Sequence, residues 1–189
     1  LQRCGVGATV APCGMLPRGR TVFRLAEQRC VVGAEKQRCL LGYGWAGGSP
    51  LDTERAASDS ESNFRLCHRI YGANRELMDS CDAISANLTP FRGISADPGT
   101  VFEVGYMIGQ GKPAFGFTLD NRYYRERAGG TYLDGLGYSI EDFEMSDNLM
   151  IEGGIYSSGG QLFVADQPGE HSFFSANLFR RCVEALARS

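Results

Sequence analysis

Residues 83–118 decide the fold, and they read AISANLTPFRGISADPGTVFEVGYMIGQGKPAFGFT. The short apolar runs at 83–88 and 112–118 are bounded by turn residues, which is typical of buried strands in a parallel sheet. Residues 99–111 between them are expected to form a helix. A strand, a helix and a strand in this order predict a right-handed crossover and a layered α/β structure.

The same alternation extends along the rest of the chain. Apolar residues spaced three and four apart predict helices over 26–41, 64–80 and 173–188. Further strands are expected at 15–22 and 161–164. We therefore predict an α/β protein, a Rossmann-like (flavodoxin-like) three-layer sandwich around a mostly parallel sheet of about five strands.

The length of 189 residues suits one domain, 1–189, and the sequence has no internal repeat. Gly, Pro and Arg are frequent near the N-terminus, so residues 1–14 are expected to form an irregular arm. Residues 47–50 (GGSP) and 56–63 (AASDSESN) predict loops, and 120–139 form a long polar segment.

Composition excludes several classes of function. The net charge of −3 is too nearly balanced for nucleic-acid binding, and the interrupted apolar stretch at 6–16 is too short to cross a membrane. Seven cysteines without a CxxC pair, and two histidines at 68 and 171 without zinc spacing, predict reduced thiols and no metal site. These features together predict a cytoplasmic protein without a cofactor.

Two carboxylates mark the place where chemistry is expected. Asp97 and Glu103 flank the start of a helix that follows a buried strand, and ligands of open α/β sheets bind beyond the carboxyl ends of the strands. One could serve as a nucleophile and the other as a proton donor, as glycosyl transfer requires. A structural interpretation is also open, because Thr100 and Glu103 match a capping box and Asp97-Pro98 is a good helix start.

Three ordered blocks around these carboxylates resemble the nucleoside 2-deoxyribosyltransferase family. They are 82–93 (DAISANLTPFRG), 97–106 (DPGTVFEVGY) and 111–113 (GKP). The segments 50–54 (PLDTE) and 147–151 (DNLMI) are similar to two further elements of that family. The resemblance covers roughly residues 19–151 and is weakest before residue 50.

The resemblance implies transfer of 2-deoxyribose between nucleobases by a retaining double displacement. Glu103 would be the nucleophile that forms a covalent glycosyl-enzyme intermediate, and Asp97 the acid/base group. The implied partners are nucleosides and free nucleobases. Two alternatives stay open: a nucleoside or nucleotide N-glycosidase of the same fold, and a nucleoside-binding protein without turnover, which Arg18 and Arg20 in the divergent segment 1–24 suggest.

The resemblance also implies a set of substrate-binding residues: Asp52, Glu54, Asn74, Gly99, Asn148 and Met150. Asn148 and Met150 are similar to residues that enter the active site of a neighbouring subunit. A homo-oligomer follows from the resemblance.

Two groups outside these motifs also need an interpretation. Gly105 and Gly109 are expected to pack closely against the sheet. Arg122, Arg125 and Arg127 lie in a loop with two tyrosines, which predicts a solvated or interfacial loop, with a phosphate site for nucleotide substrates as the alternative.

Overall fold

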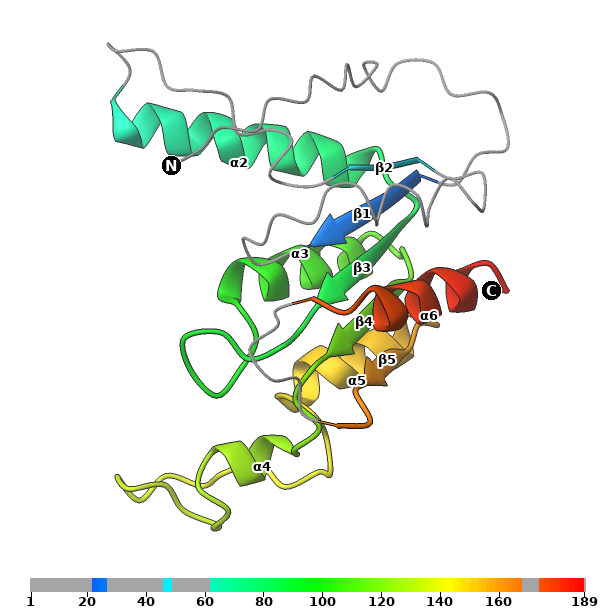
Figure 1. The fold of residues 1–189 in the computed structure, drawn as a ribbon. Helices are drawn as coiled ribbons and strands as arrows, with labels where there is room; N and C mark the ends of the chain where they lie inside the picture. The colour runs from blue at the N-terminus through cyan, green and yellow to red at the C-terminus, as the bar shows by residue number, and fades with distance from the viewer. Residues whose placement is uncertain (1–21, 27–45, 49–61, 168–173, 189) are drawn as a thin grey trace, which may run out of the picture.

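The computed structural model describes residues 22–26, 46–48, 62–167 and 174–188. In chain order the elements, labelled as in Figure 1, are β1 Val22–Ala26, β2 Ala46–Gly48, α2 Asn63–Asp79, β3 Ala83–Asn87, α3 Pro98–Gly109, β4 Ala114–Thr118, α4 Tyr124–Arg127, α5 Leu149–Ser157, β5 Leu162–Val164 and α6 Ala176–Leu186.

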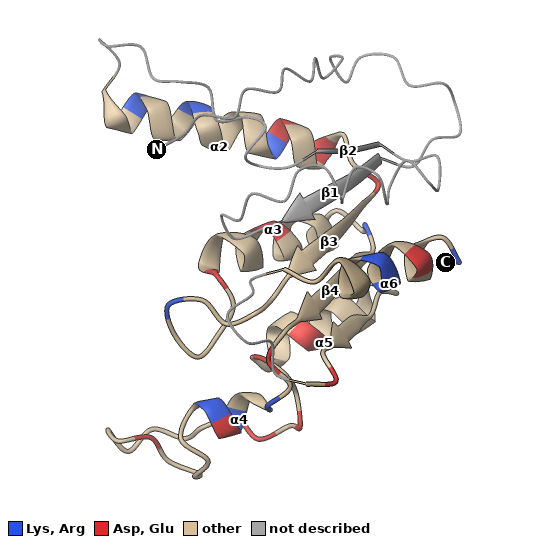
Figure 2. Ribbon diagram, viewed as in Figure 1, with Lys and Arg blue, Asp and Glu red and all other residues tan. Residues whose placement is uncertain are grey.

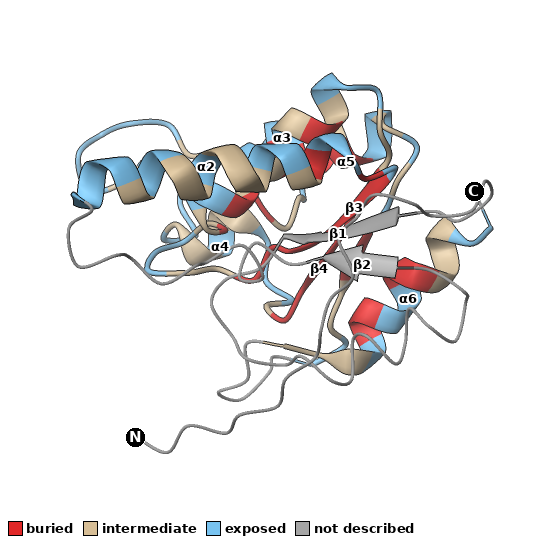
Figure 3. Ribbon diagram, turned by 90° about the horizontal axis from the view of Figure 1, so that it is seen from above, coloured by how far each residue is buried: buried red, intermediate tan, exposed pale blue. Residues whose placement is uncertain are grey.

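The five strands form one parallel sheet in the order β2-β1-β3-β4-β5. This is the strand order of flavodoxin-like proteins, which confirms the predicted fold class. The helices α2, α3 and α5 cover one face of the sheet and α6 covers the other (Figure 3). The predicted layers are therefore present.

Side chains alternate between the two faces along β3 and β4. Ile84 and Ala86 join the core beneath α3 and α5, whereas Phe115 and Phe117 join the core beneath α6. Gly116 permits the first of these cores to close, because a Cβ there would lie 2.9 Å from a methyl carbon of Leu88. A larger residue would push α5 away from the sheet.

Helix α2 is attached to the body mainly at its C-terminal end, where Met78 is its one fully buried residue among those described. The Asp79 carboxylate accepts hydrogen bonds from the Tyr106 hydroxyl at 2.7 Å and the Gln110 amide at 2.6 Å. Lys112 Nζ donates to the Met78 and Asp79 carbonyls at 2.9 and 3.0 Å. These contacts satisfy the carbonyl end of α2 and hold it beside α3.

The predicted helices and strands after residue 62 are present with shifted ends. The first described strand is Val22–Ala26, and of the strand expected at 15–22 only residue 22 lies within the described residues. The loop expected at 47–50 is wrong at residues 47 and 48, which belong to β2. Pairing with β1 outweighs the turn preference of the two glycines in β2.

The expected packing of the α3 glycines is also wrong. Gly105 and Gly109 are exposed, and a Cβ at either position would meet nothing within 4 Å. Thr100, Val104 and Met107 face the interior instead. The spacing of four does place both glycines on one face of α3, but that face is exposed to solvent.

Helix α5 was not predicted at all.

Other expectations lie outside the described residues. These include the arm 1–14, most of the helix expected at 26–41, and most of the loop at 56–63. In the segments that the structure describes, no helix combines the length and apolar character needed to span a membrane.

Candidate functional site

The loop between β3 and α3, residues 88–97, occupies the topological switch point of the sheet. The chain goes from β1 to β2 on one side of β1 and from β3 to β4 on the other, so the connections diverge between β1 and β3. Ligands of such sheets bind at this point, beyond the carboxyl ends of the strands. Figure 1 shows the loop extending from the carboxyl end of β3.

Asp97 is the N-cap of α3. Its Oδ2 atom accepts a hydrogen bond from the Thr100 N–H at 3.1 Å, and Pro98 occupies the first turn. A Cβ at position 99 would lie 3.0 Å from that same oxygen. Gly99 therefore leaves room for the Asp97 carboxylate to fold over the helix end, and the structure brings these two predicted site residues together.

Glu103 lies on the second turn of α3 and is partly buried. The capping-box interpretation of Thr100 and Glu103 is wrong, because Asp97 is the N-cap and the helix begins at Pro98, two residues before Thr100, which is buried inside the helix. The helical rise separates the Asp97 and Glu103 backbones by about 9 Å along the axis. Glu103 thus has no part in capping α3.

Asp147 joins the loop to the segment that precedes α5. One carboxylate oxygen accepts hydrogen bonds from the Ser95 hydroxyl and from the Asn148 N–H, the latter at 2.8 Å. The other oxygen accepts from the Ala96 N–H at 2.8 Å and lies 3.9 Å from Nη2 of Arg127. A single buried carboxylate therefore holds the two residues that precede Asp97.

Arg127, at the end of α4, links the same two segments through carbonyl groups. Its Nε donates to the Ile94 carbonyl at 2.8 Å, its Nη1 to the Arg122 carbonyl at 2.7 Å, and its Nη2 to the Ser146 carbonyl. The Arg127 and Asp147 side chains are each only 3% exposed. Burial lowers the pKa of the Arg127 guanidinium, and the charge of Asp147 opposes that shift.

Asn148 is the N-cap of α5. Its Oδ1 accepts from the Met150 N–H at 3.0 Å, and its Nδ2 donates to a Glu141 carboxylate oxygen at 2.7 Å. The other Glu141 oxygen accepts from the Leu149 N–H at 3.0 Å. The Met150 side chain has no comparable attachment and is 75% exposed. The local structure fixes Asn148 and leaves Met150 presented to solvent.

Among the remaining predicted substrate-binding residues, Asn74 is partly buried in the middle of α2. The Tyr71 ring, one turn before it, lies 6.2 Å from the ring of Phe102, the neighbour of Glu103 on α3. The stretch of α2 that carries Asn74 therefore lies beside the start of α3. Asp52 and Glu54 fall outside the described residues.

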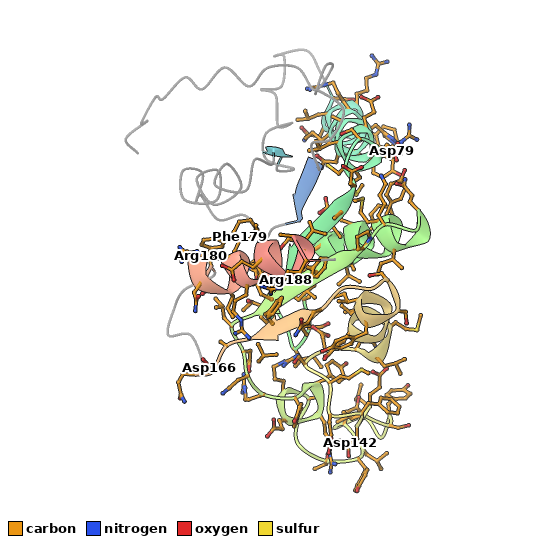
Figure 4. The ribbon with its side chains drawn as sticks, turned by 90° about the vertical axis from the view of Figure 1, so that its right-hand side faces the viewer. Asp79, Asp142, Asp166, Phe179, Arg180 and Arg188 are labelled. Carbon is orange, nitrogen blue, oxygen red and sulfur yellow. The ribbon has the colours of Figure 1, made fainter. Side chains whose placement is uncertain are left out.

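The arginines of the excursion, residues 120–146 between β4 and α5, are paired with carboxylates. Arg122 contacts Asp120 through two hydrogen bonds of 3.0 and 2.6 Å, which lower the pKa of that carboxyl, and Arg125 pairs with Asp142. Figure 4 shows Asp142 on the excursion at the opposite end of the molecule from α2, and Figure 2 shows the charges of both signs around α4. This pairing favours a structural role over a phosphate site.

The described residues contain no cluster of three His, Cys, Asp or Glu side chains able to hold a metal ion. Sequence reasoning missed the roles of Asp147 and Arg127 in the site. Ser95 and Asp147 are 52 residues apart in the chain, so no local spacing connects them. The available signal was an acidic residue directly before a helix cap.

Most of the chain matches a known protein family. Residues 19–150 match the family model described as nucleoside 2-deoxyribosyltransferase, a span that includes Asp97, Glu103 and Asn148. The chain belongs to the nucleoside 2-deoxyribosyltransferase family. That family acts on nucleosides and nucleobases.

The chain is similar to individual proteins in sequence and in structure. An uncharacterised protein of Schizosaccharomyces pombe is 32% identical over 197 residues, covering 93% of this chain and 89% of that one. A 2-desoxiribosyltransferase from Leishmania mexicana superposes with a TM-score of 0.60 at 23% identity, over 87% of this chain and 97% of that chain. A CMP N-glycosidase from Clostridium botulinum has a TM-score of 0.43 at 13% identity, over 87% and 98% of the two chains.

Proposed function

We propose that this member of the nucleoside 2-deoxyribosyltransferase family moves 2-deoxyribose from one nucleobase to another through a covalent intermediate on Glu103. The observation that carries the proposal is the location of Asp97 and Glu103 in the first two turns of one helix at the switch point of the sheet. Glu103 lies on the second turn of that helix and is partly buried.

The proposed reaction has two displacements at the anomeric carbon. A Glu103 oxygen forms a bond to that carbon while the bond to the base nitrogen breaks, and the departing base takes a proton from Asp97. The acceptor base then attacks the same carbon, gives its proton to Asp97 and releases the Glu103 carboxylate. Two inversions retain the configuration, as in retaining glycosidases.

We also propose that Asn74, together with Asp52 and Glu54, contacts the substrate. Asn74 lies on the part of α2 that runs beside the start of α3, within reach of the same region. An amide both donates and accepts hydrogen bonds, which suits the edge of a nucleobase.

A further part of the proposal is a homo-oligomer whose sites are shared between subunits. Met150 is large, apolar and mostly exposed, on a helix whose cap, Asn148, is held firmly by Glu141. Exposed apolar side chains on a fixed helix end are suited to enter a site on a second copy.

The deciding experiment mixes the protein with 2′-deoxyinosine and free adenine or cytosine and separates the products by chromatography. Transfer predicts a new nucleoside whose amount depends on the acceptor base. Free sugar that forms at the same rate with and without acceptor would indicate an N-glycosidase instead. Substrate binding without either product would indicate a binding protein. The same assay is applied to Glu103→Gln, which should not transfer the sugar. Glu76→Gln, a matched control on the exposed face of α2, should behave as the wild type.

A further inference from the structure

The excursion projects away from the sheet (Figure 1). The side chain of Arg127 nevertheless reaches back to the candidate site, where it donates to the Ile94 carbonyl. Most of the excursion is exposed or partly exposed, whereas the Arg127 side chain is almost fully buried. Burying a guanidinium is costly unless its donors are satisfied. This cost indicates a specific role for Arg127 beyond surface charge.

The guanidinium contacts mark out that role. Arg127 donates to Ile94, three residues before Asp97, and to Ser146, two residues before Asn148. The Asp147 carboxylate, which faces this guanidinium, accepts hydrogen bonds from the backbone N–H groups of Ala96 and Asn148. Two short segments that are far apart in sequence are thus crosslinked by side chains of opposite charge.

We propose that Arg127 is a positioning residue, which together with Asp147 holds the loop carrying Asp97 in register with the helix end carrying Asn148 and Met150. The proposal rests on the proposed function, because it assigns the loop to the reaction. Its consequence is that the Asp97 loop of a subunit and the residues which that subunit offers to a neighbouring site move as one unit.

Arginine is required for this arrangement on stereochemical grounds. Its planar guanidinium presents five N–H donors in fixed directions, and here they serve three carbonyls and face one carboxylate. A lysine ammonium would keep the charge opposite Asp147 but could not bridge Ile94 and Ser146 in the same way. Arg127→Lys should therefore preserve folding while loosening the loop.

The test compares Arg127→Met and Arg127→Lys with Arg122→Met. Arg122 is the matched control because it lies in the same excursion, its side chain is exposed, and its guanidinium contacts Asp120 rather than the loop. Four quantities are measured in the full chain. They are the steady-state kcat and KM for sugar transfer, and the rates of amide hydrogen exchange by NMR at Ala96 and at Phe117, in the centre of the sheet.

In both Arg127 variants we expect kcat to fall roughly 10- to 100-fold while KM changes less than about threefold, as for a misplaced catalytic group. Exchange at Ala96 should accelerate by about tenfold or more, with Phe117 unchanged, because only a local opening is made easier. Arg122→Met should match the wild type in all four quantities.

Two results would overturn the proposal. One is a kcat in both Arg127 variants equal to that of Arg122→Met. The other is equal acceleration of exchange at Ala96 and Phe117 in Arg127→Lys, which would mean that Arg127 only supports overall stability. If the wild type neither transfers nor hydrolyses, the proposed function fails, and the exchange comparison still decides whether Arg127 holds the loop.

Discussion

The Asp97 carboxylate and the Thr100 backbone N–H are joined by a hydrogen bond of 3.1 Å that starts α3. This contact gives Asp97 a structural role that can be kept while its acid/base chemistry is removed. It also places Glu103 beyond the capping positions of the helix. The two proposed catalytic carboxylates can therefore be tested with different substitutions.

Asp97→Asn should keep the fold and lose sugar transfer. Asparagine caps helices about as well as aspartate, whereas Asp97→Ala removes the cap at a cost of about 1 kcal/mol. For a chain of this size that cost lowers the melting temperature by about 2–4 °C. Calorimetry should separate the two variants, while both should lose activity. Normal turnover in Asp97→Asn would remove Asp97 from the mechanism.

Two glycine substitutions should change stability in opposite directions. Gly116→Ala places a Cβ 2.9 Å from Leu88 and 3.0 Å from Leu162, and overpacking of this kind costs about 1–3 kcal/mol. Gly105→Ala meets nothing within 4 Å in the middle of α3 and should stabilise the helix by up to about 1 kcal/mol. Chemical denaturation measures both changes. A destabilised Gly105→Ala variant would show that another surface packs there.

The titration of Glu152 should lower the free energy of unfolding as the pH rises. Burial raises the pKa of this carboxyl, Asp147 adds to the shift, and the hydrogen bond from the Ser146 N–H opposes it. The folded state then binds the Glu152 proton more tightly than the unfolded chain, so its contribution is present at low pH and lost as pH rises through the raised pKa.

Glu152→Gln removes that titration and keeps an oxygen that can accept from Ser146. The melting temperature of Glu152→Gln minus that of the wild type should therefore increase from about pH 4 to about pH 7. Parallel melting curves across this range would contradict the assignment.

Mixing two inactive variants should restore activity if the sites are shared. Glu103→Gln disables the nucleophile of its own subunit, and Met150→Asp disables the neighbour's site. In a mixed oligomer a site is intact where Glu103 comes from the Met150→Asp chain and Met150 from the Glu103→Gln chain, so an equal mixture should recover about a quarter of wild-type activity after subunit exchange. Failure of mixed oligomers to recover any activity would place Met150 in the site of its own chain.

Most elements after residue 62, α4 and α5 excepted, were predictable because the strands β3 and β4 are fully buried and the predicted helices carry apolar residues on one face. The strand 83–88 and the helix that starts at Asp97-Pro98 illustrate this, since local sequence signals and tertiary structure agree there. In contrast, β2 consists of Ala-Gly-Gly and is a strand only because β1 lies beside it. Short elements of this kind have no periodicity to detect.

The candidate site was predictable in part for the same reason. Asp97, Gly99 and Glu103 lie within one local motif, so the sequence places them together. Asp147 and Arg127 reach the loop only through the folded chain, and a charged residue in a polar segment usually remains in solvent. Their burial depends on tertiary contacts that no spacing rule describes.

The most direct test of Glu103 as the nucleophile is mass spectrometry of the protein after incubation with a slow 2-fluoro-2-deoxy nucleoside. The expected result is one fluorinated sugar per active site, attached to the peptide that contains Glu103 and absent from Glu103→Gln. That variant should also keep its fold and lose transfer by several orders of magnitude. A sugar attached elsewhere, or near-normal turnover in well-folded Glu103→Gln, would contradict the proposed mechanism.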